Sequence, residues 1–229
     1  MVIDCVTKND QQACDYSDII IALNERDQNE IEKRYHRKVD LLSPIVFSDQ
    51  YNQPNYPEGL TSVIPICLFL GSYFSMNVKG ILWFVQNVLP QVNIKLQIVG
   101  KGMKAILPMV ANHPNIEVYS DVADLKPYIE NADFMLLPIF EGSGMKVKTC
   151  EALMYGKNII GTTEAFEGYN VDYEKVGALC NTKEDFIKVL DSVSKHPVPR
   201  FNQYARQIFL DKYSEEDRKK RFEKTFKPI

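Results

Sequence analysis

The chain has 229 residues, of which 45% are hydrophobic and 25% are charged, and its formal net charge is −3. This balance is that of a globular protein with a real core, and the net negative charge argues against a general nucleic-acid binder. No run of about eighteen uncharged apolar residues occurs, and the first ten residues lack the pattern of a signal peptide. The five cysteines are scattered and odd in number, so we expect reduced thiols in a cytoplasm.

The first elements predicted along the chain are a buried strand over residues 18–23 and a charged helix over residues 25–35, which Asn24 can cap. Residues 48–61 follow, rich in Pro, Asn, Gln and Tyr, and they predict a linker. A lone strand and helix cannot bury their own faces. We therefore expect the segment before the linker either to belong to a partner domain or to fold back onto the main sheet.

From residue 62 onward, apolar runs of strand length alternate with helical stretches. This alternation predicts an α/β fold, a Rossmann-like parallel sheet with helices on both faces. The six predicted strands lie near residues 64–70, 95–99, 116–119, 134–137, 158–161 and 178–180. The predicted helices lie near residues 80–88, 103–110, 123–130, 145–154 and 183–193, followed by two helices within 202–226 that break near Tyr213 and Ser214.

The loop after the fourth of these strands carries the clearest chemical signal. Ligands bind at the carboxyl ends of parallel strands, and here Gly142 and Gly144 lead into a helix whose first amide groups can bind an anion. Lys148 and Glu151 are three residues apart and share one helix face. A lysine suits a phosphate, and a carboxylate accepts hydrogen bonds from ribose hydroxyls. The alternative is a surface Lys–Glu pair beside an ordinary glycine turn.

The run from Gly144 through Lys146, Lys148 and Glu151 to Gly156 resembles the donor-site helix of the retaining GT-B glycosyltransferases known as group 1. Residues 69–90, 96–102 and 116–138 are similar, in the same order, to other segments of that family's donor-binding domain. The resemblance covers about residues 62–195. It implies one half of a GT-B two-domain architecture: residues 1–47 as the end of the N-terminal acceptor domain, 48–61 as a linker, 62–197 as the donor domain, and 198–229 as C-terminal helices.

The resemblance also assigns roles. It implies that Glu151 holds the ribose, that Lys79 and Lys148 lie near the diphosphate, and that Val122 contacts the base, so that Lys79, Lys148 and Glu151 form the predicted catalytic set. Ser143 stands where the family has a glutamate that touches the donor sugar, and Ser72 where it usually has an arginine. Glu141 can replace that glutamate only if its loop bulges. The predicted donor-binding residues are Gly71, Ser72, Gly100, Val122, Glu141, Gly142, Ser143, Gly144, Met145 and Lys146.

The function implied is transfer of a sugar from a UDP- or GDP-type nucleotide sugar to an acceptor glycan or lipid-linked glycan. The acceptor is held by the absent N-terminal domain, so we expect this chain alone to be inactive. The resemblance implies no cofactor, no metal and no nucleic acid, and a cytoplasmic protein that in full-length form can lie peripherally at a membrane. Two alternatives are a sugar-nucleotide epimerase of the same fold, and a degenerate module that binds a nucleotide or a partner without turnover.

Overall fold

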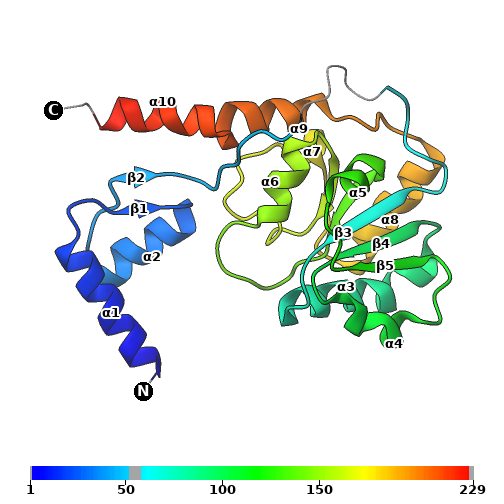
Figure 1. Ribbon diagram of the computed structural model, residues 1–229, viewed down its shortest axis with the longest axis horizontal. Coiled ribbons are helices and arrows are strands. Elements are labelled where there is room, and N and C mark those ends of the chain that lie inside the picture. The colour runs from blue at the N-terminus through cyan, green and yellow to red at the C-terminus, as the bar shows by residue number, and fades with distance from the viewer. Residues whose placement is uncertain (1, 52–57, 227–229) are drawn as a thin grey trace.

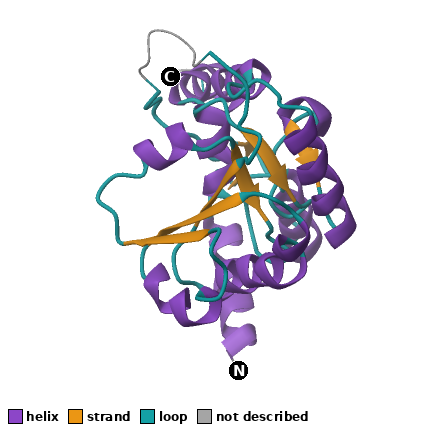
Figure 2. Cartoon of the chain, turned by 90° about the vertical axis from the view of Figure 1, so that its right-hand side faces the viewer, coloured by secondary structure: helices purple, strands orange, loops and turns teal. Residues whose placement is uncertain are grey.

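The computed structural model describes residues 2–51 and 58–226 (Figure 1). Its main body is a parallel sheet of six strands in the order β5-β4-β3-β6-β7-β8, which confirms the predicted fold class. The strands are β3 (Ile66–Leu70), β4 (Lys95–Gly100), β5 (Ile116–Ser120), β6 (Phe134–Leu137), β7 (Asn158–Gly161) and β8 (Gly177–Leu179). Figure 2 shows helices on both sides of this sheet.

Both faces of the sheet are buried, which is why its strands read as continuous apolar runs in the sequence. Along β3, Leu68 and Leu70 point into one hydrophobic cluster, while Cys67 and Phe69 point into another. The register is regular: Phe69 pairs with Ile98 of β4.

Each face has its own helices. The Phe69 face is covered by α3 (Ser75–Asn87), α4 (Leu107–Val110) and α8 (Lys183–Lys195). The Leu68 face is covered by α5 (Lys126–Asn131), α6 (Val147–Met154) and α9 (Gln203–Ile208). The short helix α7 (Tyr173–Val176) leads into β8, and 3-10 turns occupy Leu89–Gln91 and Met103–Ile106.

A π-helical turn, Phe209–Tyr213, extends α9, and Ser214, which is extended at φ −88° and ψ 155°, separates this turn from α10 (Glu215–Thr225). The break was predicted at this place. Ser214 is the N-cap of α10, and its side chain accepts a hydrogen bond from the Asp217 amide.

The N-terminal segment forms a separate small unit, with α1 (Val2–Tyr16) and α2 (Glu25–Tyr35) beside a parallel pair of short strands, β1 (Ile21–Ala22) and β2 (Leu41–Leu42). The Asn24 cap was predicted correctly, since Asn24 Oδ1 accepts from the Asp27 amide at 2.8 Å. Of the two expectations for this segment, it does not join the main sheet within the described residues.

Two elements of this unit were not predicted. The middle of helix α1, residues 7–12, is entirely polar, so no apolar period runs through the helix. The contacts of α1 with α2 include a hydrogen bond from Tyr35 Oη to Asp10 at 3.1 Å. Strand β2 has only two residues, too few for an alternating pattern.

The segment around strand β1, residues 19–23, alternates between exposed and buried side chains. Ile20 and Ala22 are buried with Val39, whereas Ile19, Ile21 and Leu23 are exposed. The small unit reaches the main body through contacts such as that of Phe47 with Ser214. The domain division drawn from the sequence stays a prediction, and residues 52–57 of the predicted linker lie outside the described residues.

Candidate functional site

A cavity of about 620 Å³ opens at the carboxyl ends of β3 and β4, against the start of α6. Six of the predicted site residues line it: Gly71, Ser72, Gly100, Val122, Lys148 and Glu151. Its other lining residues are Leu70, Asn77, Val99, Lys101, Asp121, Leu125 and Val147. The sheet edge named from the sequence therefore does carry a cavity, and α6 contributes the lysine and the carboxylate together.

The loops under the cavity are fixed by backbone contacts. The Gly71 amide donates to Val99 O at 3.0 Å, and the Tyr73 amide to Lys101 O at 2.8 Å, so that β3 and β4 stay paired beyond their ends. Gly100 makes this approach possible, because a Cβ on it would lie 1.9 Å from Gly71 O. These contacts hold Gly71 and Gly100, which line the cavity, against each other.

Lys148 lies at the centre of the site. Its Nζ donates to Asn77 Oδ1 at 2.6 Å and lies 4.9 Å from the centroid of the Phe69 ring. Asn77 Nδ2 donates to Ser72 O at 3.0 Å, so these contacts join α6 to the loop after β3. Burial lowers the pKa of Lys148 to about 8, although the nearby charge of Glu151 opposes the shift.

Glu151 lies one helical turn further along α6. Burial raises the pKa of its carboxyl group, and the positive charge of Lys148 acts in the opposite direction. A carboxylate in this position accepts hydrogen bonds, and the adjacent lysine attracts an anion. The pair suits a ligand that carries hydroxyl groups next to a phosphate.

The loop before α6 lies outside the cavity and carries the predicted residues Gly142, Ser143, Gly144, Met145 and Lys146. Helix α6 begins at Val147 rather than near Gly144 as predicted. The reason is local: Gly144 has a φ of 65°, and Lys146 is extended at φ −90° and ψ 114°.

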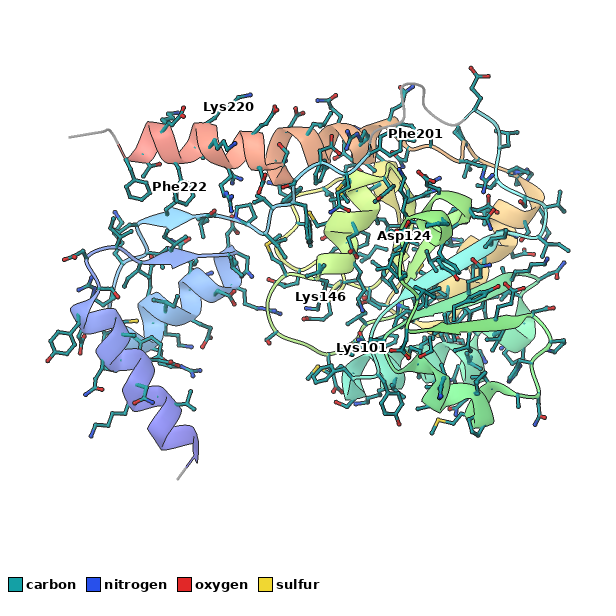
Figure 3. All side chains as sticks on the ribbon, in the orientation of Figure 1. Lys101, Asp124, Lys146, Phe201, Lys220 and Phe222 are labelled. Atoms are coloured by element: carbon teal, nitrogen blue, oxygen red, sulfur yellow. The ribbon has the colours of Figure 1, made fainter. Side chains whose placement is uncertain are left out.

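Lys146 turns back over this loop. Its Nζ donates to Gly144 O and to Glu164 Oε1, both at 2.7 Å (Figure 3 labels Lys146). Glu164 follows β7, and Arg26 of α2 donates to its other oxygen at 3.1 Å. Burial alone would raise the pKa of Glu164, but the hydrogen bonds from Lys146 and Arg26 bring the pKa below its usual value.

Lys79 and Glu141 form an ion pair with each other, and both are exposed. They line a small separate cavity of about 150 Å³ together with Trp83 and Phe140. Neither residue lines the larger cavity. Their roles at the diphosphate and at the donor sugar stay predictions.

Asn77 was missed as a site residue, although its position in the first turn of a helix that follows a strand could have drawn attention to it. Asp121 was also missed. It has a φ of 57° and accepts a hydrogen bond from the Gly102 amide at 3.1 Å, so it fixes the turn after β4.

Two other cavities lie away from this edge. One of about 600 Å³ lies at the amino ends of β6, β7 and β8. One of about 530 Å³ lies between the N-terminal unit, the segment 163–173 after β7, and residues 211–221 near the start of α10. Within residues 2–51 and 58–226, no group of three or more His, Cys, Asp or Glu side chains could hold a metal ion. None of the helices in those ranges combines the length and apolar character needed to cross a bilayer.

Comparison with solved structures places the fold. TarM superposes with a TM-score of 0.75 at 14% identity, covering 96% of this chain and 46% of TarM. Sucrose-phosphate synthase from Thermosynechococcus elongatus gives 0.73 at 15% identity, covering 93% of this chain and 58% of the enzyme. Anabaena HepE, solved with UDP-glucose, gives 0.71 at 12% identity, covering 96% and 67%. At these identities the likeness shows a shared GT-B half, and hence the fold.

Sequence comparison identifies the family. A Klebsiella pneumoniae protein described as an uncharacterized 44.6 kDa protein in the cps region is 25% identical over 174 residues, or 70% of this chain and 45% of that protein. The chain therefore spans less than half the length of this relative. The family model for group 1 glycosyl transferases matches residues 64–195, more than half of the chain. The chain belongs to the group 1 glycosyl transferases.

Proposed function

We propose that this chain is the donor-binding half of a retaining glycosyltransferase that moves a sugar from a nucleotide-diphosphate sugar to an acceptor. The observation that carries the proposal is the pairing of Lys148 and Glu151 on α6, in a cavity at the carboxyl edge of a parallel sheet. HepE was solved with UDP-glucose, and a variant of S. aureus TarM with UDP, so a uridine nucleotide is the first ligand to test.

The order of groups along the cavity suggests how the donor lies. Val122 and Leu125 offer an apolar wall for the base, and Glu151 accepts hydrogen bonds from the ribose. Lys148 and Asn77, with the backbone of the loop after β3, then face the diphosphate. A nucleotide placed in this way runs along α6 toward its first residue.

Lys148 and the amide groups at the start of α6 would act electrostatically in the reaction. As the bond to the anomeric carbon breaks, negative charge develops on the leaving diphosphate, and donors aimed at that charge lower the barrier. Lys148 supplies a charged donor, and the amide groups at the start of α6 add partial positive charge. No protein nucleophile is required for this part of the reaction.

The acceptor site belongs to the half that lies outside this chain. The acceptor, a glycan or a lipid-linked glycan, the cytoplasmic location and peripheral contact of the whole protein with a membrane stay proposals. The epimerase alternative is not favoured, because the family that matches is that of group 1 glycosyl transferases.

Calorimetric titration of the chain with UDP, UDP-glucose, GDP and GDP-mannose tests the proposal. We expect one pair to bind, and Glu151→Ala to abolish that binding because the ribose loses its acceptor. Glu174→Ala, on the exposed surface of α7, is the matched control and should bind as the wild type does. If Glu151→Ala binds normally, the ribose assignment is wrong. If the wild type binds none of the four, the site is not a preformed donor site.

A further inference from the structure

The strongest feature that the proposed function does not use is a chain of ion pairs between the N-terminal unit and the loop before α6. Glu164 receives hydrogen bonds on both carboxylate oxygens, from Lys146 at 2.7 Å and from Arg26 at 3.1 Å. The side chains of Lys146 and Glu164 are only 11% and 17% exposed. An anionic group is thus held nearly out of water at one defined place.

Lys146 directly precedes α6, next to the large cavity but not among the residues that line it. Along α6, Glu151 comes one turn inside the helix, Lys148 lies in the first turn, and Lys146 precedes it. A donor with its ribose at Glu151 and its diphosphate at Lys148 therefore directs its sugar toward the loop that Lys146 ends. This step rests on the proposed function.

Glu164 lies against the backbone of the same loop, the loop before α6. A Cβ on Gly142 would lie 3.5 Å from Glu164 Oε1 and 3.2 Å from Lys146 Nζ, so both charged groups lie against the Gly142 backbone. Ser143, the next residue, carries no carboxylate. Glu164, the carboxylate that Lys146 and Arg26 hold, comes from the loop after β7 and not from the loop before α6.

We propose that Glu164 is the residue that recognises the donor sugar, accepting hydrogen bonds from hydroxyl groups of the hexose, and that Lys146 and Arg26 hold it in place. A carboxylate has about four acceptor positions, so two bound cations leave room for sugar hydroxyls. Arg26 comes from α2, and Lys146 directly precedes α6. These two partners orient the carboxylate oxygens of Glu164 before the donor binds.

Glu167 provides a matched control. It lies in the same loop and pairs with Arg26 Nε at 3.5 Å, and no contact with Lys146 is seen among its interactions in the described residues. Replacing Glu167 by Gln removes a charge from the same neighbourhood and weakens an ion pair of the same arginine. It leaves untouched the carboxylate that we assign to the sugar.

The test compares the affinity for a nucleotide sugar with that for the bare nucleotide, using UDP-glucose, UDP-galactose and UDP-N-acetylglucosamine against UDP, and GDP-mannose against GDP. We expect Glu164→Gln to weaken the best nucleotide sugar about tenfold. The affinity for the bare nucleotide should change less than about twofold, and Glu167→Gln should leave both unchanged within the same limit. Thermal unfolding of each variant checks that it is folded.

The ratio of the two affinities separates sugar recognition from a merely structural role. Equal weakening of nucleotide and nucleotide sugar in Glu164→Gln, or no weakening of either, overturns the proposal. So does a wild type that binds no nucleotide sugar more tightly than its bare nucleotide. Failure of the proposed function gives a different result, because then the wild type binds neither UDP nor GDP, or Glu151→Ala leaves binding intact.

Discussion

The ionisation of Lys148 gives the sharpest prediction about the site. Burial brings its pKa to about 8, so the side chain changes charge within a range that titration can reach. About 90% of the lysine is protonated at about pH 7 and about 10% at about pH 9. If the protonated lysine binds the diphosphate, the affinity for UDP-glucose falls roughly tenfold between these two values.

Ligand binding and the protonation of Lys148 are coupled. A bound anionic diphosphate favours the charged lysine and raises its pKa, so binding near pH 8 takes up roughly half a proton for each ligand. Calorimetry in buffers that differ in ionisation enthalpy counts this proton directly. UDP-glucose is the suitable probe, because its diphosphate has no ionisation in this range.

Lys148→Met is the control for this experiment. It should bind UDP-glucose about tenfold more weakly than the wild type near neutral pH, with no change in affinity toward higher pH and no proton uptake. A wild-type affinity that stays constant over the whole range would refute the assignment of Lys148 to the diphosphate. A pH dependence that survives in Lys148→Met would assign the titration to another group.

Two further predictions concern stability. Gly100→Ala places a Cβ 1.9 Å from Gly71 O, so it should lower the free energy of unfolding in urea by about 1–3 kcal/mol and also weaken nucleotide binding; an unchanged urea midpoint would contradict this reasoning. Lys157 is 4% exposed and donates to two backbone oxygens, of Glu130 at 2.9 Å and Ala132 at 2.8 Å, and burial lowers its pKa to about 8. Because the unfolded chain keeps this proton up to higher pH, the wild type should gain stability relative to Lys157→Met as pH rises from about 8 to about 10.4, by up to about 3 kcal/mol. Parallel pH dependence in the two proteins would show that Lys157 is not the group responsible.

The sequence predicted those features that depend on local pattern. Strands such as Phe134–Leu137 are apolar throughout because both faces of the sheet are covered, so their order along the chain was visible. The shared face of Lys148 and Glu151 follows from helix geometry alone. The cap at Asn24 was equally local.

Contacts between distant residues could not be predicted in this way. Asn77 and Lys148 are 71 residues apart, and Lys146 and Glu164 are 18 apart, so their meeting depends on where two loops end in space. Lys79 shows the same limit. Its place before Gly80 is visible in the sequence, but its pairing with Glu141 away from the large cavity is not.

The exposed aliphatic side chains near strand β1 favour self-association of the protein in solution. Ile19, Ile21 and Leu23, which lie in or beside β1, are exposed to water, and β1 pairs on one side only within the described residues. Exposed strands of this kind associate edge to edge, and the tendency grows with protein concentration. Sedimentation or light scattering at the working concentration should therefore precede each titration, so that heats of self-association are not counted as heats of ligand binding.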